Sequence, residues 1–404
     1  MPGSATFAPL AQRAFLLILV GSLLSNFGNA IESVGAAWQL TVTGQPADVI
    51  ALVQTALNLP IMLLALPAGA WADMHDRRGI MLLAQSGMFA VSVLLVVLTF
   101  GGVTSPVAIV GLTALLAAGV ALFNPALSAS IGGIVPRAQL AAAVALNILA
   151  FNVARSLGPA LGGAIVSAGG AAAAFVANAL SYLMAIAVLW RWRPEPAPPK
   201  ERRRLLPVIA EGLGAALRSR EIRTILLRAF TFTVTGAAAW ALMPLVASDL
   251  LGKGSAVYGL LLGALGLGAV LGAASSTWFR ARLSAEAIIR GSGLVYGLGC
   301  IGVALEPGLP AMLALLVVAG AGWVQALSGF SVAGQLWAPR EVVGRIVAMV
   351  SSLTFGGIAL GSWLWGHFAE RFGPDGALLV SGGAMVLLPV IGLLWPMPAH
   401  EAPS

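Results

Sequence analysis

Charged residues are scarce in this chain. Of its 404 residues only 9% are Asp, Glu, Lys or Arg, whereas 59% are hydrophobic. A soluble protein is about 25% charged, and a soluble chain of this length would need that charge to cover its surface. The composition therefore argues against a water-soluble enzyme or binding protein, and lipid is the expected solvent for most of the chain.

Cysteine and histidine are nearly absent as well. The single cysteine, Cys300, permits no internal disulfide, and the three histidines show no metal-ligand spacing. The sequence also lacks HExxH, P-loop and GxSxG elements. We therefore expect no bound metal, no other cofactor and no enzymatic activity.

What the sequence has instead is a series of long apolar runs. A helix needs about 20 apolar residues to cross the bilayer core, and the runs are continuous rather than alternating, which favours helices over a β-barrel. The first run is too long for the core of a signal peptide, so we expect it to be retained. The runs lie near residues 14–38, 49–70, 80–100, 104–129, 140–167, 170–190, 223–248, 256–279, 286–304, 308–335, 341–367 and 375–396. They predict an all-α integral membrane protein with twelve transmembrane helices.

The basic residues gather in alternate loops between these runs. If the N-terminus is inside, most of the 22 Lys and Arg residues fall in inside loops. This positive-inside bias predicts a multi-pass protein of the bacterial inner membrane with both termini in the cytoplasm. The same bias accounts for the net charge of +7 without a nucleic-acid partner.

The chain divides into two similar halves. A shift of 203 residues places Arg77 on Arg280 and the pair Pro136-Arg137 on Pro339-Arg340. Between the halves, residues 191–222 are basic and proline-rich, as expected for a cytoplasmic linker. We therefore expect six helices in residues 1–190 and six in residues 223–404, related by an axis along the membrane normal.

The loop between the second and third runs carries a family motif. GAWADMHDRR resembles the loop signature of the major facilitator superfamily, whose transporters bind substrate between two such halves near the midplane. The matching positions are Gly69, Asp73, Arg77 and Arg78. Asp76 departs from the signature. The ending D-R-R, however, resembles the form of this motif in the transmembrane secretion effector subgroup, which includes enterobactin-exporter-like proteins. The resemblance covers most of the N-terminal half in detail and the whole chain in architecture.

This resemblance implies that Gly69, Asp73, Asp76, Arg77 and Arg78 form a cytoplasmic gate motif. Gly69 lets two helices approach closely, and Asp73 can cap a helix or pair with arginine. The two arginines can hold the loop against the other half, as a latch that stabilises the outward-open state, or against anionic lipid. The alternative is that they are ordinary positive-inside charges.

A second motif lies in the fifth run. ARSLGPALGG, residues 154–163, resembles the fifth-helix signature of drug–proton antiporters and implies export, although Leu115 stands where their fourth-helix signature has arginine. Gly158 and Pro159 permit a kink, and Gly162 and Gly163 let a neighbouring helix pack tightly. The motif therefore indicates either a rocking gate or static close packing.

Two ionisable residues lie inside apolar runs. Arg155 is near the middle of its run, where an arginine costs about 2.5 kcal/mol or more, so it must face a wet cavity or a partner. Glu32 is the candidate counter-charge for Arg155 and the candidate proton carrier. The structural alternatives place Glu32 at a solvated outer mouth and give Arg155 the role of tying two helices together. Arg228, close to the start of the seventh run, is expected to snorkel to the cytoplasmic face.

Further polar and aromatic residues are expected to line a substrate cavity together with Arg155. They are Asn26, Asn29, Gln54, Asn58, Asn152, Trp240 and Gln325. The sequence thus predicts a monomeric exporter of a small amphipathic molecule, such as a drug-like compound or siderophore, working by alternating access and proton antiport. Its partners are the substrate, protons and the lipid bilayer. The alternatives are proton-coupled uptake of an anionic metabolite anchored by Arg155, and a membrane scaffold or sensor that transports nothing.

Overall fold

The computed structural model describes residues 7–103, 105–193, 213–339 and 342–397, and the elements within them are helices. In the N-terminal part these are η1 (Ala8–Ala11), α2 (Arg13–Val42), α3 (Ala47–Met74), α4 (Arg77–Phe100), α5 (Pro106–Ile131), η2 (Arg137–Gln139) and α6 (Leu140–Arg191). In the C-terminal part they are α8 (Arg220–Gly236), α9 (Ala238–Ala241), α10 (Met243–Leu245), η3 (Val246–Leu250), α11 (Ser255–Arg280), α12 (Ala285–Ala304), α13 (Leu309–Trp337) and α14 (Val343–Leu394).

Two of the helices are hairpins. α6 and α14 are each 52 residues long, which would be about 78 Å if straight, and each contains a non-helical glycine, Gly170 with φ 70° and Gly373 with φ 76°. The positive φ is a conformation that glycine adopts without strain. The two arms of α6 lie on either side of α2, because Gly158 packs against Ala30 while Ser181 packs against Gly28.

Among the described residues, ten helices are long and apolar enough to cross a membrane. With α6 and α14 counted as two spans each, this is consistent with the twelve expected helices, and the observed ends lie within a few residues of the expected ones. The seventh span is the most broken. It runs through α8, α9, α10 and the π-helical η3, with Pro244 in α10, where it removes a backbone donor.

The internal repeat is visible in the helix contacts. In one half Gly158 of α6 packs against Ala30 of α2, and in the other Gly361 of α14 packs against Val234 of α8. Each pair lies close to the expected shift of 203 residues. The fold is therefore a pair of pseudo-symmetric helical bundles. Of the expected linker, residues 194–212 lie outside the described residues.

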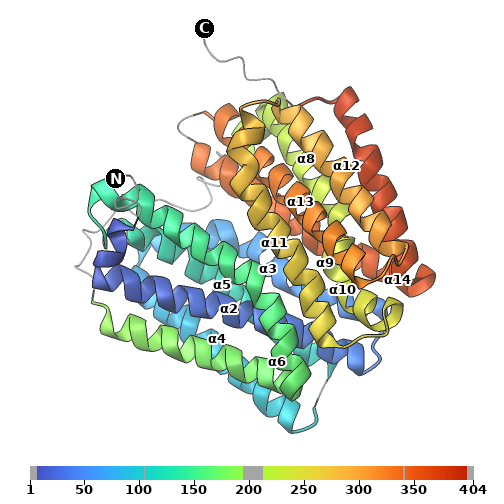
Figure 1. The fold of residues 1–404 in the computed structure, drawn as a ribbon. Helices are drawn as coiled ribbons and strands as arrows, with labels where there is room; N and C mark the ends of the chain where they lie inside the picture. The colour runs from blue at the N-terminus through green and yellow to red at the C-terminus, as the bar shows by residue number, and fades with distance from the viewer. Residues whose placement is uncertain (1–6, 104, 194–212, 340–341, 398–404) are drawn as a thin grey trace.

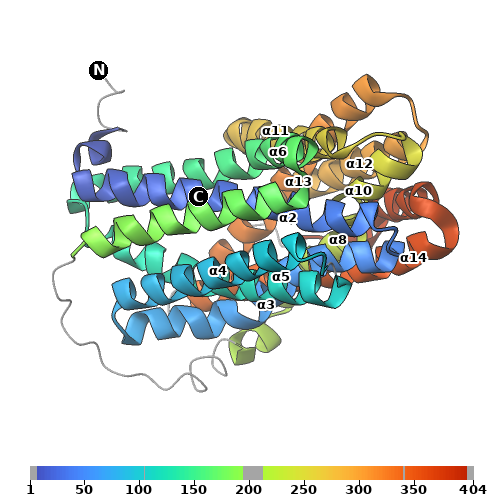
Figure 2. The same ribbon diagram turned by 90° about the horizontal axis from the view of Figure 1, so that it is seen from below.

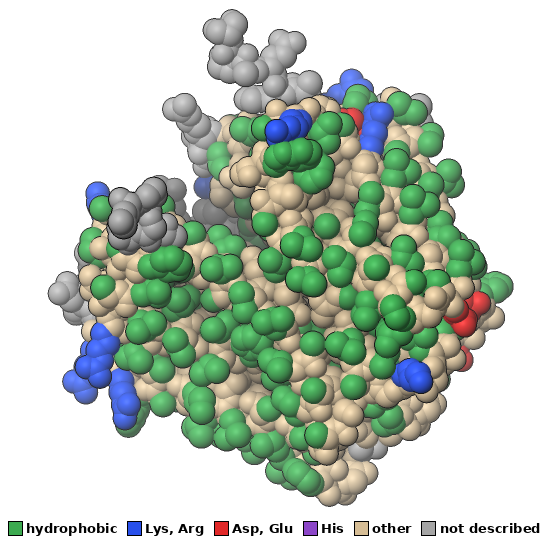
Figure 3. All heavy atoms as spheres, in the orientation of Figure 1, with side chains coloured by type: hydrophobic (Ala, Val, Ile, Leu, Met, Phe, Trp, Pro, Cys, Tyr) green, Lys and Arg blue, Asp and Glu red, His purple; other side chains and the backbone are tan. Residues whose placement is uncertain are grey.

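The two bundles meet at one end and diverge at the other (Figures 1 and 2). α6 and α11 approach each other at the converging end, whereas η1, where the described chain begins, lies toward the diverging end (Figure 1). On the face in Figure 3, hydrophobic side chains cover the middle, and charged side chains lie toward the margins. Leu63, Val97 and Leu298 are exposed apolar side chains of membrane helices, as expected for a surface that contacts lipid.

Candidate functional site

A cavity of about 290 Å³ lies between the two bundles. Its wall is formed by α2, α3, α5 and α6 from the N-terminal bundle and by α9, α11, α13 and α14 from the C-terminal bundle. Most of the candidates named from the sequence line it: Asn26, Asn29, Glu32, Gln54, Asn58, Arg155 and Trp240. Apolar side chains such as Leu262, Leu327 and Phe355 complete the wall, which is therefore amphipathic.

Two candidates lie outside this wall. Asn152 is in α6 but its amide donates to the Ile148 carbonyl oxygen of the same helix, at 2.9 Å. Gln325 is buried between α13 and α11, where its amide lies 3.4 Å from the Ser275 hydroxyl. Neither residue lines the cavity, because which residues of a helix reach it depends on the rotation of that helix, which the sequence pattern alone does not fix.

The polar side of α2 serves two purposes. Residues three and four apart share a helix face, which is why its serines, asparagines and Glu32 follow one side. Asn29 accepts a hydrogen bond from the Tyr182 hydroxyl in α6, and Ser25 accepts one from the Gln85 amide in α4 at 3.2 Å. These bonds fasten α2 within its own bundle, while Asn26, Asn29 and Glu32 also reach the cavity wall.

Glu32 is held by a residue that the sequence analysis missed. Its side chain is 1% exposed, and the Thr113 hydroxyl of α5 donates to its Oε1 atom at 2.9 Å. No ion pair joins Glu32 to Arg155 in the part of the chain that the structure describes. The counter-charge hypothesis therefore does not describe this conformation. A lone threonine in an apolar run gives no sequence signal of such a pairing.

Arg155 contacts an aromatic ring of the other bundle. Its guanidinium carbon lies 5.3 Å from the centre of the Trp240 ring, within the range of a cation–π interaction. Trp240 in α9 also packs against Trp323 of α13, with ring centres 6.3 Å apart. Arg155 and Trp240 thus join the two bundles across the cavity.

On one side of the interface between the bundles, residues of the fifth-span motif pack against α11. A Cβ atom on Gly163 would lie 2.8 Å from the Cα atom of Gly259 in α11, and the Ser156 hydroxyl donates to the Gly266 carbonyl oxygen at 2.8 Å. Gly158 and Gly162 face α2 instead. The only non-helical residue within α6 is Gly170, so the helix passes through Pro159 without a break.

On the other side of the interface, α3 packs against α14 in a pseudo-symmetric contact. The Thr55 hydroxyl of α3 donates to the Ala359 carbonyl oxygen of α14 at 2.8 Å. Nearer the turn, the backbone N–H of Ala47 donates to Glu370 at 2.7 Å. The cavity is therefore sealed at the end where the bundles converge.

The loop motif makes its contacts within the N-terminal bundle in this conformation. Asp76 caps α4 by accepting from the backbone N–H of Gly79 at 2.9 Å. Arg77 donates to the Ala129 carbonyl oxygen at 2.6 Å, and Arg78 donates to the Leu189 carbonyl oxygen at 3.0 Å. Gly69 has open space where a Cβ atom would lie, and the side chain of Asp73 lies outside the described part of the structure.

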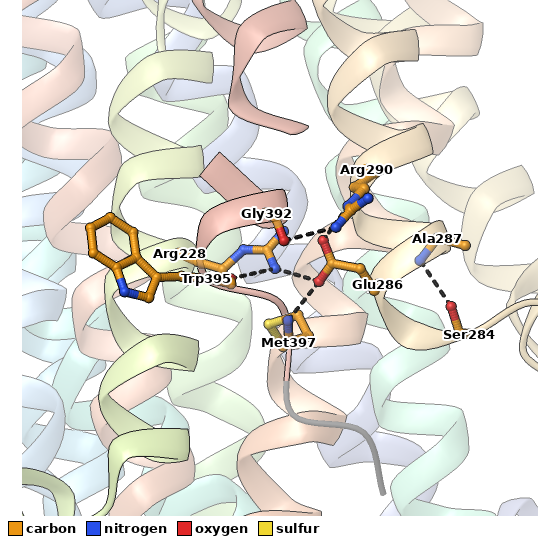
Figure 4. Close-up of polar contacts among 8 residues, drawn as sticks. All are labelled: Arg228, Ser284, Glu286, Ala287, Arg290, Gly392, Trp395 and Met397. Atoms are coloured by element: carbon orange, nitrogen blue, oxygen red, sulfur yellow. Dashed lines mark hydrogen bonds and ion pairs between the residues drawn. The ribbon is translucent and has the colours of Figure 1, made fainter. Parts of the chain in front are cut away.

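Arg228 does not snorkel, contrary to the sequence-based expectation. Its side chain is 8% exposed and pairs with Glu286 of α12, which also accepts from Arg290 at 2.5 Å (Figure 4). Glu286 accepts a further bond from the backbone N–H of Met397 at 2.6 Å, and Arg290 donates to the Gly392 carbonyl oxygen at 2.7 Å. A carboxylate shared by two arginines explains why Arg228 stays buried.

Known proteins resemble the chain over nearly all of its length. The family model described as transmembrane secretion effector matches residues 4–404. The multidrug efflux pump Tap of Mycolicibacterium fortuitum is 26% identical over 395 residues, which cover 94% of this chain and 95% of that protein. The enterobactin exporter EntS of Shigella boydii is 25% identical over 400 residues, covering 94% of this chain and 91% of that protein.

A solved structure supports the fold. The crystal structure of the nucleoside transporter NupG superimposes with a TM-score of 0.77 at 11% sequence identity. The superposition covers 94% of this chain and 99% of that one.

Proposed function

The chain belongs to the transmembrane secretion effector family of the major facilitator superfamily, and we propose that it exports a small amphipathic molecule by alternating access. As a member of this family it is a multi-pass transporter of the bacterial inner membrane rather than a soluble enzyme. Relatives named as a multidrug efflux pump and an enterobactin exporter favour the outward direction.

The observation that carries the proposal is the cavity between two bundles that, within the described residues, pack together at one end and diverge at the other. With both termini in the cytoplasm, as the loop charges indicate, the sealed end is periplasmic and the cavity faces the cytoplasm. An exporter loads its substrate in this conformation. Release then requires the bundles to part at the Gly163–Gly259 and Thr55–Ala359 contacts and to close at the other end.

The loop motif is the candidate latch for that second conformation. Arg77 and Arg78 now bond carbonyl oxygens of their own bundle. When the cytoplasmic ends approach, Arg77 and Arg78 are charged groups that can bridge them. In our proposal this contact stabilises the outward-open state.

Export is coupled to proton entry through Glu32. The supporting observations are that this carboxyl group lines the cavity, is almost fully buried and has one hydroxyl donor, Thr113. A buried carboxyl group can exchange its proton only when the adjacent cavity opens to water. Alternating access therefore exposes Glu32 first to one side of the membrane and then to the other. The transporter works as a monomer, since each bundle completes the cavity with the other.

The proposal is tested with purified protein in liposomes that contain a panel of amphipathic fluorescent dyes. We expect dye transport driven by an imposed pH gradient, with Glu32→Gln losing the response to the gradient. The matched control is Thr99→Val, because the Thr99 hydroxyl donates to the Leu95 carbonyl oxygen of its own helix and to no other described residue. Transport that ignores the gradient would refute proton coupling, and absence of transport for the whole panel would refute export of this substrate class.

A further inference from the structure

Arg155 carries a charge that nothing in the described structure neutralises. Its one specific contact is the face of Trp240, and no carboxylate or carbonyl oxygen within the described residues accepts a bond from it. Other arginines in the described structure do have oxygen acceptors. Arg228 and Arg290 share Glu286, and Arg77 reaches the Ala129 carbonyl oxygen.

Arg155 lines the cavity, so an acceptor for its N–H groups would have to come from the cavity. Among the described residues that line the cavity, Glu32 is the one acidic residue, and it is hydrogen-bonded to Thr113 rather than to Arg155. An arginine side chain stays protonated in proteins. The cavity therefore holds a fixed positive charge, and keeping such a charge unpaired inside a membrane protein is costly unless a ligand or water supplies the acceptor.

Trp240 positions this charge for a ligand. The cation–π contact with the Trp240 ring face uses no oxygen acceptor, so the N–H groups of the guanidinium stay available to a ligand. Two parallel N–H groups match the two oxygens of a carboxylate or phosphate. The Trp240 ring thus fixes the guanidinium without using its hydrogen-bonding capacity.

The rest of the wall completes the recognition site. Asn26 and Asn58 offer neutral amides, while Leu262, Leu327 and Phe355 offer apolar contact. We infer that the exported molecule is an amphipathic organic anion whose acidic group pairs with Arg155 and whose apolar body lies against these side chains. A cationic molecule in the same place would meet the charge of Arg155.

This inference rests on the proposed export function, but its test measures binding alone. The purified full-length protein is titrated by calorimetry with naphthoate, naphthamide and naphthylmethylammonium, which share one ring system and differ in charge. We expect naphthoate to bind at least about tenfold more tightly than the other two, as for a charge-assisted bidentate pair. Arg155→Gln should remove that preference, and Arg155→Lys should keep part of it.

Asn152→Ala is the matched control, because Asn152 lies one turn away on α6 with its amide bonded within the helix. It should bind naphthoate as the unchanged protein does. Equal binding of the three compounds, tighter binding of the ammonium, no binding of naphthoate, or an unchanged preference in Arg155→Gln overturns the inference. Dye export that responds to the pH gradient would then still stand, so the two proposals fail separately.

Discussion

Gly163 of α6 and Gly259 of α11 are in backbone contact across the interface between the two bundles. A Cβ atom on Gly163 would lie 2.8 Å from the Cα atom of Gly259, closer than real side chains approach. The Ser255 hydroxyl donates to the Gly163 carbonyl oxygen at 3.3 Å and holds the same point. These contacts set the distance at which this end of the transporter closes.

Gly163→Val should therefore disfavour the conformation seen here. Overpacking of this kind costs about 1–3 kcal/mol, and each 1.4 kcal/mol shifts an equilibrium about tenfold. We expect dye export to fall by about tenfold or more, while the protein still inserts and purifies. The measurement is initial export rate in liposomes.

Gly111→Ala provides the control for that substitution. Gly111 is also in a membrane helix, but a Cβ atom there would meet nothing within 4 Å. Its export rate should remain near that of the unchanged protein. Normal export by Gly163→Val would show that the glycine contact does not limit the transport cycle.

Thr113→Val should impair proton-driven export by leaving Glu32 without its hydroxyl donor. A hydrogen bond to a charged group is worth about 1.5–3 kcal/mol, so we expect roughly a tenfold loss of the gradient-driven rate. Thr113→Ser keeps the hydroxyl and should retain most of the rate. Equal rates for the valine and serine variants would remove Thr113 from the coupling site.

Glu286→Ala should destabilise the C-terminal bundle. The substitution strands Arg228, which is 8% exposed, and removes the acceptor for the Met397 N–H. Breaking a buried ion pair costs about 3 kcal/mol or more, so the thermal midpoint in detergent should fall by several degrees. Arg220→Ala, at the exposed start of the same α8 helix, should leave the midpoint nearly unchanged. A similar midpoint for both variants would contradict a stabilising role for Glu286.

Asp76→Ala should weaken the start of α4. The carboxylate accepts from the backbone N–H groups of Arg78 and Gly79, so its loss costs about 1 kcal/mol. Asp76→Asn retains a capping acceptor and should restore the thermal midpoint. If asparagine restores stability but not export, the negative charge of Asp76 has a role in the transport cycle beyond capping.

The membrane helices could be predicted from the sequence because their signal is local. Length and hydropathy alone place most helix ends within a few residues, and the repeat of 203 residues anticipates the paired contacts of Gly158 and Gly361. The turns at Gly170 and Gly373, where the chain reverses direction, also fall where two expected runs meet. None of these features depends on how a helix is rotated about its axis.

The candidate site depended on that rotation and was only partly predicted. Asn26, Gln54, Asn58 and Arg155 reach the cavity, but Asn152, only three residues from Arg155, turns back to its own helix. The partners of the charged residues were missed too. Thr113 rather than Arg155 bonds Glu32, and Trp240 rather than Glu32 contacts Arg155. Such pairs join segments that are far apart in the sequence, so one sequence by itself gives no signal of them.

The network around Glu286 has a consequence for how the protein is made. Arg228 belongs to α8, but its partners lie on α12 and in the segment after α14, at Glu286 and the Trp395 carbonyl oxygen. During synthesis α8 reaches the membrane long before these acceptors leave the ribosome, and a lone arginine opposes its insertion. Arg228 therefore gains its partners only after α12 and α14 have followed, so the packing of α8 in the C-terminal bundle is completed late in synthesis.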